Sequence, residues 1–229
     1  MMDQLGGMVM AGAVFLLAVL CLASRLPAGL RWMLVGGLLM RVVGVVAMLA
    51  IIFTVYGGTA DAVKYLRVGS GYAERMLTGD FRMITQQTEW AAGQWWGSHF
   101  VYLLSAPVAR ILGPGYFGPF LLFSLIAFAG LCLFAAAFAR TYPHVPLVNY
   151  TRWLFFFPSL WLWPSVVGKE SLILFGLGLL AYGYFRDRVA WLPTASGLAL
   201  IFAIRPQVAA VAAFSMIVAQ WVGRHQRWT

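Results

Sequence analysis

The sequence contains few charged residues and little cysteine, and each shortage excludes a class of protein. Only 10% of its 229 residues are charged, while 62% are hydrophobic. Soluble domains average about 25% charged and about 45–50% apolar residues, so this chain has too little polar surface to cover itself in water. Both cysteines, Cys21 and Cys132, lie inside apolar runs, which argues against a disulfide framework or a thiolate metal site. The expected solvent is a lipid bilayer.

Acidic residues are the scarcest charged type, with seven Asp and Glu against sixteen Lys and Arg. The basic residues lie at the ends of apolar runs, as in the cytoplasmic loops of membrane proteins, so nucleic acid is not expected as a partner. The three histidines, His99, His144 and His225, lack metal-ligand spacing. No cofactor is therefore expected; a divalent cation stays open as an alternative, without a visible ligand cluster.

The apolar runs predict an all-α polytopic membrane protein with about six or seven transmembrane helices and an interfacial helix in an outer loop. One crossing takes roughly 20 apolar residues. A short run at 99–112 contains Pro107 and Arg110, which favours an interfacial or half-crossing helix. We expect a single membrane domain over 1–229. The expected crossings are 6–24, 33–56, 116–139, 153–163 with its continuation, 172–185, 191–204 and 207–222.

Charge divides the polar segments between the two sides of the membrane. The segments near 25–32, 140–152, 186–190 and 223–229 together hold eight bases and one acid. The N-terminus, the loop at 57–98 and the turn at 169–170 hold five bases and six acids. Cytoplasmic loops carry the excess of Lys and Arg, so the first group is expected in the cytoplasm and the long loop outside.

Several residues inside the apolar runs bear on helix packing. Glycines at 36, 37, 44, 176, 178 and 183 are expected to let helices approach closely. Arg41 lies about nine residues into its span; it either snorkels towards the cytoplasmic face or faces a partner. Arg205-Pro206 splits a long apolar run, so Arg205 either faces a cavity or marks a tight turn at the outer surface.

Asp61 stands where the second span leaves the bilayer. If the chain continues there as a helix, Asp61 and Tyr65 lie one turn apart and share a face with Val68 and Tyr72. A carboxylate held at the mouth of a helix bundle can act as a general base. The alternative is an acidic residue that favours the positive end of the helix dipole.

Lys169 and Glu170 lie in a turn between two apolar runs, after Pro164 and Gly168. A cation and a carboxylate placed there can bind a phosphate and an acceptor hydroxyl, or can be charged simply because a turn reaches water. A phosphate-binding loop of the Walker type is excluded, because position 163 is Trp and position 170 is Glu.

The order of these features resembles the N-terminal membrane half of the GT-C glycosyltransferases, the polytopic enzymes of the protein-mannosyltransferase and lipid A aminoarabinose-transferase type. The shared order is an acid and a tyrosine opening the first outer loop, a short run ending at Gly-Pro, and a long span ending in Arg. A proline-broken helix, a Lys-Glu turn and an Arg-Pro pair follow. These are Asp61 with Tyr65, 99–114, Ala139-Arg140, Pro158-Ser159, 169–175 and 197–206.

The resemblance implies that Asp61 is the catalytic carboxylate and Glu170 a second carboxylate at the outer mouth. Lys169 and Arg205 would neutralise phosphate charge, and Lys64, Tyr65 and His99 would help to bind substrate. The donor would be a sugar linked to polyprenyl phosphate, the acceptor a lipid or glycan, and the location a bacterial cytoplasmic (inner) membrane.

Two other functions stay open at this point. One is a non-catalytic accessory subunit of a membrane assembly, with a membrane-protein partner. The other is a transporter or lipid flippase that uses Arg41, Glu170 and Arg205 as charges along one pathway; this requires the three side chains to line a single water-filled route.

Overall fold

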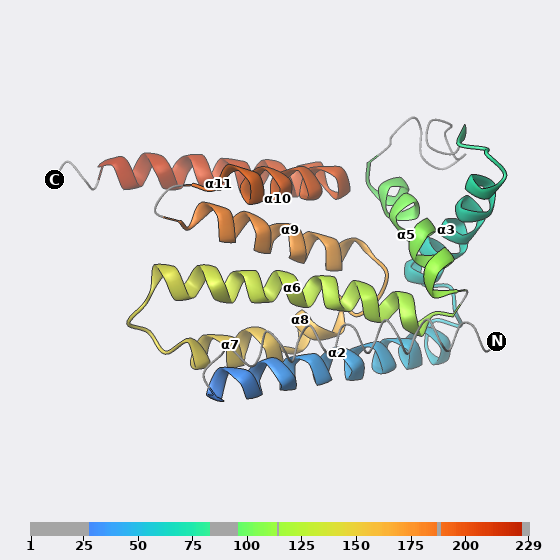
Figure 1. The fold of residues 1–229 in the computed structure, drawn as a ribbon, viewed down its shortest axis with the longest axis horizontal. Helices are drawn as coiled ribbons and strands as arrows, with labels where there is room; N and C mark the ends of the chain where they lie inside the picture. The colour runs from blue at the N-terminus through green and yellow to red at the C-terminus, as the bar shows by residue number, and fades with distance from the viewer. Residues whose placement is uncertain (1–27, 83–95, 114, 187–188, 226–229) are drawn as a thin grey trace.

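The computed structural model describes residues 28–82, 96–113, 115–186 and 189–225, and every regular element in these ranges is an α-helix (Figure 1). The expected all-α class is therefore confirmed for this part of the chain. The expected first crossing at 6–24 and part of the loop at 57–98 lie outside the described residues. The helices are α2 (Ala28–Thr54), α3 (Asp61–Leu77), α5 (Ser98–Leu112), α6 (Phe117–Thr141), α7 (Leu147–Phe156), α8 (Pro158–Leu162), α9 (Lys169–Tyr184), α10 (Trp191–Ile204) and α11 (Pro206–His225).

Most of these helices lie roughly side by side in a stack. α2 packs on α7, α8 and α6, α6 packs on α9, α9 on α10 and α10 on α11. α3 and α5 pack on each other as a separate hairpin at one end of the stack (Figure 1). The helix ends consequently fall into two groups at opposite ends of the molecule.

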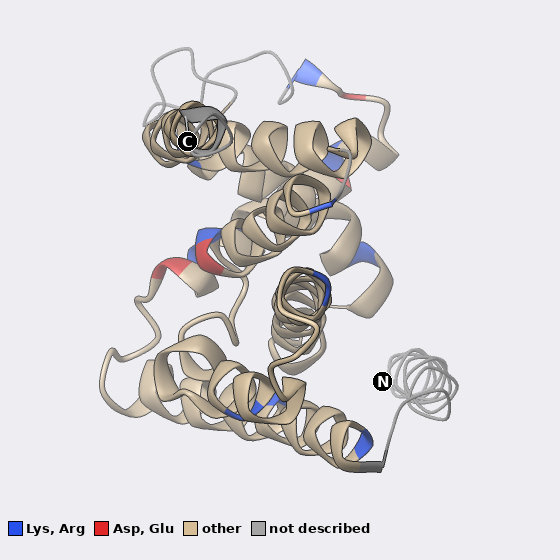
Figure 2. Cartoon of the chain, turned by 90° about the vertical axis from the view of Figure 1, so that its left-hand side faces the viewer, with Lys and Arg blue, Asp and Glu red and all other residues tan. Residues whose placement is uncertain are grey.

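One end holds the start of α2, the α6–α7 and α9–α10 connections and the end of α11 (Figure 1). We call it the arginine end, because its described charges are Arg31, Arg140, Arg152 and Arg186. The opposite end holds the α3–α5 hairpin and the starts of α6, α9 and α11. We call it the mixed-charge end, since it carries the four described acids, Asp61, Glu74, Asp80 and Glu170, together with bases. Charged residues occupy only a small part of the ribbon (Figure 2).

Two described helices are long and apolar enough to cross a membrane, namely Gly29–Thr54 and Phe117–Thr141. Three further expected crossings, at 172–185, 191–204 and 207–222, fold as shorter helices, and the one expected at 153–163 is divided between α7 and α8. Their apolar segments are 14 residues in Trp191–Ile204 and 17 in Pro206–Val222, and α9 has 16 residues. A straight crossing of about 30 Å takes about 20 residues, so length and composition support two spans directly.

Glycine contacts hold the stack together, as the sequence predicts. A Cβ added at Gly178 would lie 2.7 Å from the Cα of Gly130, so α6 and α9 touch backbone to backbone. A Cβ at Gly176 would meet Ile201 at 2.8 Å, and one at Gly37 would meet Phe128 at 2.7 Å. Small residues permit such approach between membrane helices, where packing replaces the hydrophobic drive available in water.

Two prolines divide the chain between α7 and α9. Pro158 separates α7 from α8, and Pro164 follows α8. A proline has no N–H, so the carbonyl four residues before it loses its helical donor. The carbonyl of Leu160 receives instead a hydrogen bond of 2.9 Å from Nη1 of Arg41. The side chain of Arg41 thus substitutes for the missing donor at a helix break.

Arg41 is fully buried, which corrects the expectation that it snorkels to a helix end. Its guanidinium lies 5.3 Å from the centre of the Phe128 ring, and its Nε and Nη2 have no hydrogen-bond partner among the described residues. The alternative of a partner inside the bundle is the one observed. Arg41 therefore joins α2 to α6 and α8.

We expect Arg41→Ala to lower the free energy of unfolding by about 2 kcal/mol, because it leaves a cavity beside Phe128 and an unpaired carbonyl at Leu160. Arg41→Met should recover most of the loss, since Met fills the space and buries no charge. Thermal unfolding in detergent measures both. If Met were no better than Ala, the hydrogen bond rather than packing would be the dominant contribution.

Candidate functional site

Five helices begin at the mixed-charge end, and four of them carry predicted site residues in their first turns or just before them. α3 begins at Asp61, α9 begins at Lys169, and α11 begins directly after Arg205. α5 begins at Ser98, next to His99. The unpaired N–H groups of a helix N-terminus favour negative charge. This end of the fold therefore suits an anionic ligand.

Glu170 and Arg205 form an ion pair, with 3.0 Å between Oε1 and Nη2. Both side chains are about half exposed, at 49% and 42%. Gly168 precedes α9, and a Cβ there would lie 3.2 Å from Oε2 of Glu170, so the glycine leaves room for this carboxylate. Two residues 35 positions apart in the sequence are thus brought together at the start of α9 and α11.

Arg205 occupies the turn between α10 and α11, which agrees with the expectation of a tight turn. Its backbone N–H still bonds the carbonyl of Ile201 at 2.7 Å and closes α10. The Nη2 contact uses one of the five N–H donors of a guanidinium. A second anion can therefore be bound by the same side chain.

Tyr65 lies on the buried face of α3. Its ring is buried against Tyr102, and burial raises the pKa of its hydroxyl, while a hydrogen bond with the Ser98 side chain lowers it. The negative charges of Asp61 and Glu170 both raise the pKa of Tyr65 further, which places the two carboxylates in one electrostatic neighbourhood. At neutral pH the phenol is protonated and can donate a hydrogen bond.

The start of α5 is fixed to the end of α10. The N–H of Gly97 donates to the carbonyl of Ala203 over 2.8 Å, two residues before Arg205. Gly97 has a φ of 75°, a left-handed conformation that favours glycine. This contact holds the start of α5, and with it Ser98, close to the turn that carries Arg205.

His99 lies inside the α3–α5 hairpin and is 5% exposed. Its Nδ1 is 3.5 Å from the hydroxyl of Tyr72, and the two rings meet edge to face. Tyr72 in turn packs on Tyr102. The structure thus places His99 behind the Tyr65–Tyr102 pair, where it positions aromatic rings rather than facing the surface.

The predicted face of α3 forms as expected, with Tyr65 and Tyr72 buried and Asp61 exposed at its outer end. Asp61 is the first residue of α3 and an acidic residue in its first turn, and the N-cap residue is Ala60. Lys64 is exposed on α3, and Lys169 is half-buried as the first residue of α9. The structure therefore gathers Asp61, Tyr65, Lys169, Glu170 and Arg205 at one end, with Lys64 and His99 on the periphery.

Three further residues belong to this region but were not identified from the sequence, namely Gly97, Ser98 and Tyr102. The run at 99–112 was expected as a helix, but nothing in it indicated which side chains face α3. A serine at the first position of a helix is a weak signal by itself. Within the described ranges, no group of three or more His, Cys, Asp or Glu is placed to hold a metal ion.

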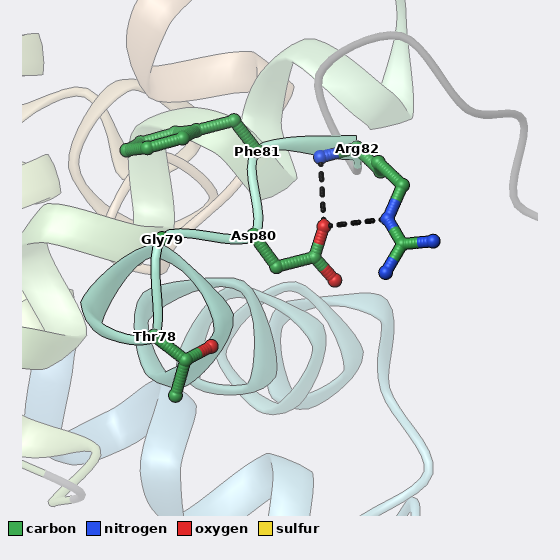
Figure 3. A pocket seen from close by; sticks show the side chains of 5 residues that line it. All are labelled: Thr78, Gly79, Asp80, Phe81 and Arg82. Carbon is green, nitrogen blue, oxygen red and sulfur yellow. Dashed lines mark hydrogen bonds and ion pairs between the residues drawn. The ribbon is translucent and has the colours of Figure 1, made fainter.

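A separate hollow lies at the end of α3, lined by Thr78, Gly79, Asp80, Phe81 and Arg82 (Figure 3). Its charged groups pair with each other. One Asp80 carboxylate oxygen accepts from the backbone N–H of Arg82 at 3.1 Å and from its Nε at 3.0 Å. These bonds hold the pKa of the Asp80 carboxyl below its usual range. The hollow contains none of the predicted site residues.

Comparison of the chain with family models, with curated proteins and with solved structures finds no match. The residues at the mixed-charge end are therefore the basis for inferring a function.

The Glu170–Arg205 pair should contribute little to stability, because exposed ion pairs are worth about 0–1 kcal/mol. We expect Glu170→Gln, Arg205→Gln and the double variant to unfold within about 1 kcal/mol of the parent protein. A double-mutant cycle on thermal unfolding measures the coupling. A coupling well above this value would make the pair a structural element instead of an available site.

Proposed function

We propose that the chain is an integral membrane glycosyltransferase of the GT-C type, moving a sugar from a polyprenyl-phosphate donor to a lipid or glycan acceptor. The observation that carries the proposal is the Glu170–Arg205 ion pair, which lies at the same end of the fold as Asp61 and Tyr65 at the start of α3 (Figure 1). Four residues from three separate segments thus lie at one end of the fold, the end at which we propose that a lipid-borne donor arrives. Their order in the sequence is the order that the resemblance to this superfamily implies.

In the proposed reaction, Asp61 accepts the proton of the acceptor hydroxyl. The freed oxygen attacks the anomeric carbon of the sugar and forms the new glycosidic bond. The bond from that carbon to the phosphate oxygen breaks, and polyprenyl phosphate leaves with the electron pair. Positioned cations and helix N-termini stabilise the charge that develops on a leaving group, and Lys169 and Arg205 are the cations available here.

Glu170 has a positioning role in this proposal. Its carboxylate holds Arg205 over 3.0 Å and leaves the remaining guanidinium donors for phosphate. Tyr65, protonated and hydrogen-bonded with Ser98, is proposed as a hydrogen-bond donor to the substrate. Lys64 and His99 are proposed only as peripheral contacts, since one is exposed on α3 and the other is enclosed by aromatic rings.

The proposed location is a bacterial inner membrane, with several crossings and the mixed-charge end outside. Its support is the distribution of charge over the two ends. The described charges of the arginine end are all basic, whereas the described acids lie at the opposite end. Cytoplasmic loops retain Lys and Arg, so the arginine end is assigned to the cytoplasm.

The position of Arg41 argues against a transport function. Transport would require Arg41, Glu170 and Arg205 to line one route. Arg41 is enclosed by α2, α6 and α8, whereas Glu170 and Arg205 lie at the starts of α9 and α11.

The test of the proposed function is turnover of polyprenyl-phosphate-linked sugars by the purified chain in detergent. We expect release of polyprenyl phosphate from at least one donor sugar, by transfer or by slow hydrolysis. Folded protein that releases none from a panel of hexose and pentose donors would contradict it. Co-purification of a fixed partner in that case would favour the accessory-subunit function instead.

A further inference from the structure

A cavity of about 410 Å³ lies at the break between α7 and α8, towards the arginine end. It is lined by Asn149, Arg152, Trp153, Phe156, Phe157 and Pro158. These residues stand on one face of α7 and continue across the break. The cavity is distant in the fold from the mixed-charge end and contains none of the residues assigned to sugar transfer.

The break at Pro158 produces this cavity. Phe157 is extended, with φ −66° and ψ 122°, so the chain leaves the helical path for one residue. The side chain of Trp161 turns back and donates from Nε1 to the carbonyl of Phe156 over 3.2 Å. The break is therefore held by its own hydrogen bond.

The lining changes from polar to apolar along α7. Asn149 and Arg152 lie near the start of the helix, and Phe156, Phe157 and Pro158 lie deeper. At 1.5 Å per residue, Arg152 is about 7 Å and Phe156 about 14 Å from the first residue of α7. If α7 begins at the membrane surface, Arg152 lies at the level of the headgroups and Phe156 in the hydrocarbon, because the headgroup layer is roughly 5–7 Å thick.

Arg152 is exposed and, in the part of the chain that the structure describes, no ion pair or hydrogen bond engages its guanidinium. The described acids all belong to the opposite end of the fold. Trp153 beside it is 72% exposed, as is typical of an aromatic side chain at a membrane interface. The cavity thus offers a cation and an amide at its polar mouth and aromatic rings at its base.

We propose that this cavity binds an anionic phospholipid of the cytoplasmic leaflet, with the lipid phosphate on Arg152 and Asn149 and an acyl chain along Phe156, Phe157 and Pro158. The inference rests on the membrane orientation in the proposed function, but not on sugar transfer. Charge complementarity selects the headgroup, since a guanidinium donates two parallel hydrogen bonds to a phosphate. The cavity is polar at its mouth and apolar at its base, and a phospholipid is likewise polar at its headgroup and apolar along its acyl chains.

The test is the amount of phosphatidylglycerol retained by purified protein after detergent exchange, measured by native mass spectrometry against phosphatidylcholine with the same acyl chains. We expect the parent protein to retain phosphatidylglycerol preferentially. Arg152→Gln should lower retention about fivefold, because the attraction between one basic side chain and anionic lipid changes the binding affinity by about that factor. Arg152→Lys should retain an intermediate amount, because it keeps the charge and loses the bidentate geometry.

Arg140→Gln is the matched control, because it removes one exposed cation from the same end outside the cavity. It should leave retention unchanged. Equal losses in the Arg140 and Arg152 variants, no loss in either, or no preference over phosphatidylcholine would overturn the proposal. So would displacement by inorganic phosphate, which would indicate a site for the free anion.

Size-exclusion profiles in detergent establish that each variant is folded. The donor-turnover assay is run on the same samples. If the protein retains the lipid but turns over no donor, the proposed function has failed while this inference stands.

Discussion

Replacing Asp61 with Asn should lower sugar transfer by about 10²- to 10⁴-fold, the contribution usual for a positioned general base. The amide has nearly the same shape as the carboxylate but does not accept the acceptor's proton. Asp61 is exposed at the start of α3, so the change should leave the fold intact. Release of polyprenyl phosphate per unit of folded protein is the measurement.

Glu74→Gln is the control for Asp61, since Glu74 is also an exposed acid on α3. It lies more than three turns further along the helix and should retain full turnover. Full activity in Asp61→Asn would remove Asp61 from the mechanism. Equal losses in the two variants would indicate an effect of α3 charge in general.

Gly178→Leu should have the largest effect on stability, lowering the free energy of unfolding by about 3 kcal/mol or more. A Cβ at this position would lie 2.7 Å from the Cα of Gly130, which is backbone and does not rotate away. α6 and α9 would have to separate along their whole contact. Thermal unfolding in detergent, read by the loss of monodisperse protein, measures the change.

Gly71→Leu is the matched control for Gly178. Gly71 is also a helical glycine, but a Cβ there meets nothing within 4 Å. Its replacement should be neutral or stabilising by about 0.5–1 kcal/mol, because glycine weakens a helix interior. If both variants lost stability equally, a general effect of adding a leucine side chain, rather than close packing, would explain the result at Gly178.

Helix positions and close contacts could be predicted from the sequence where a short stretch of residues was sufficient evidence. Apolar runs predicted the helices, since an apolar run such as 116–139 has few stable conformations in a bilayer other than a helix. Glycines predicted contacts because only glycine permits backbone approach, as at Gly178. The outcome for Arg41 could not be predicted in the same way. Its partner is a carbonyl 119 residues away, freed by a proline that the sequence shows only as a helix breaker.

The candidate site was predictable in its members but not in its pairings. Glu170 and Arg205 were each identified as charges beside a helix break, yet their ion pair depends on how α9 packs on α10. His99 illustrates the opposite case. A histidine at the start of a short helix is typical of a residue at the membrane interface. Only the tertiary packing of α3 on α5 encloses His99 against Tyr72.

The central claim is that a polyprenyl-phosphate donor is bound where α3, α5, α9 and α11 begin. Photo-crosslinking with a donor that carries a reactive group next to its phosphate tests this most directly, with crosslinked peptides identified by mass spectrometry. The account predicts adducts at 61–65, 97–102 and 168–171, reduced by Arg205→Gln and absent with excess unlabelled donor. Adducts confined to the arginine end, or spread evenly along the lipid-facing helices, would contradict it.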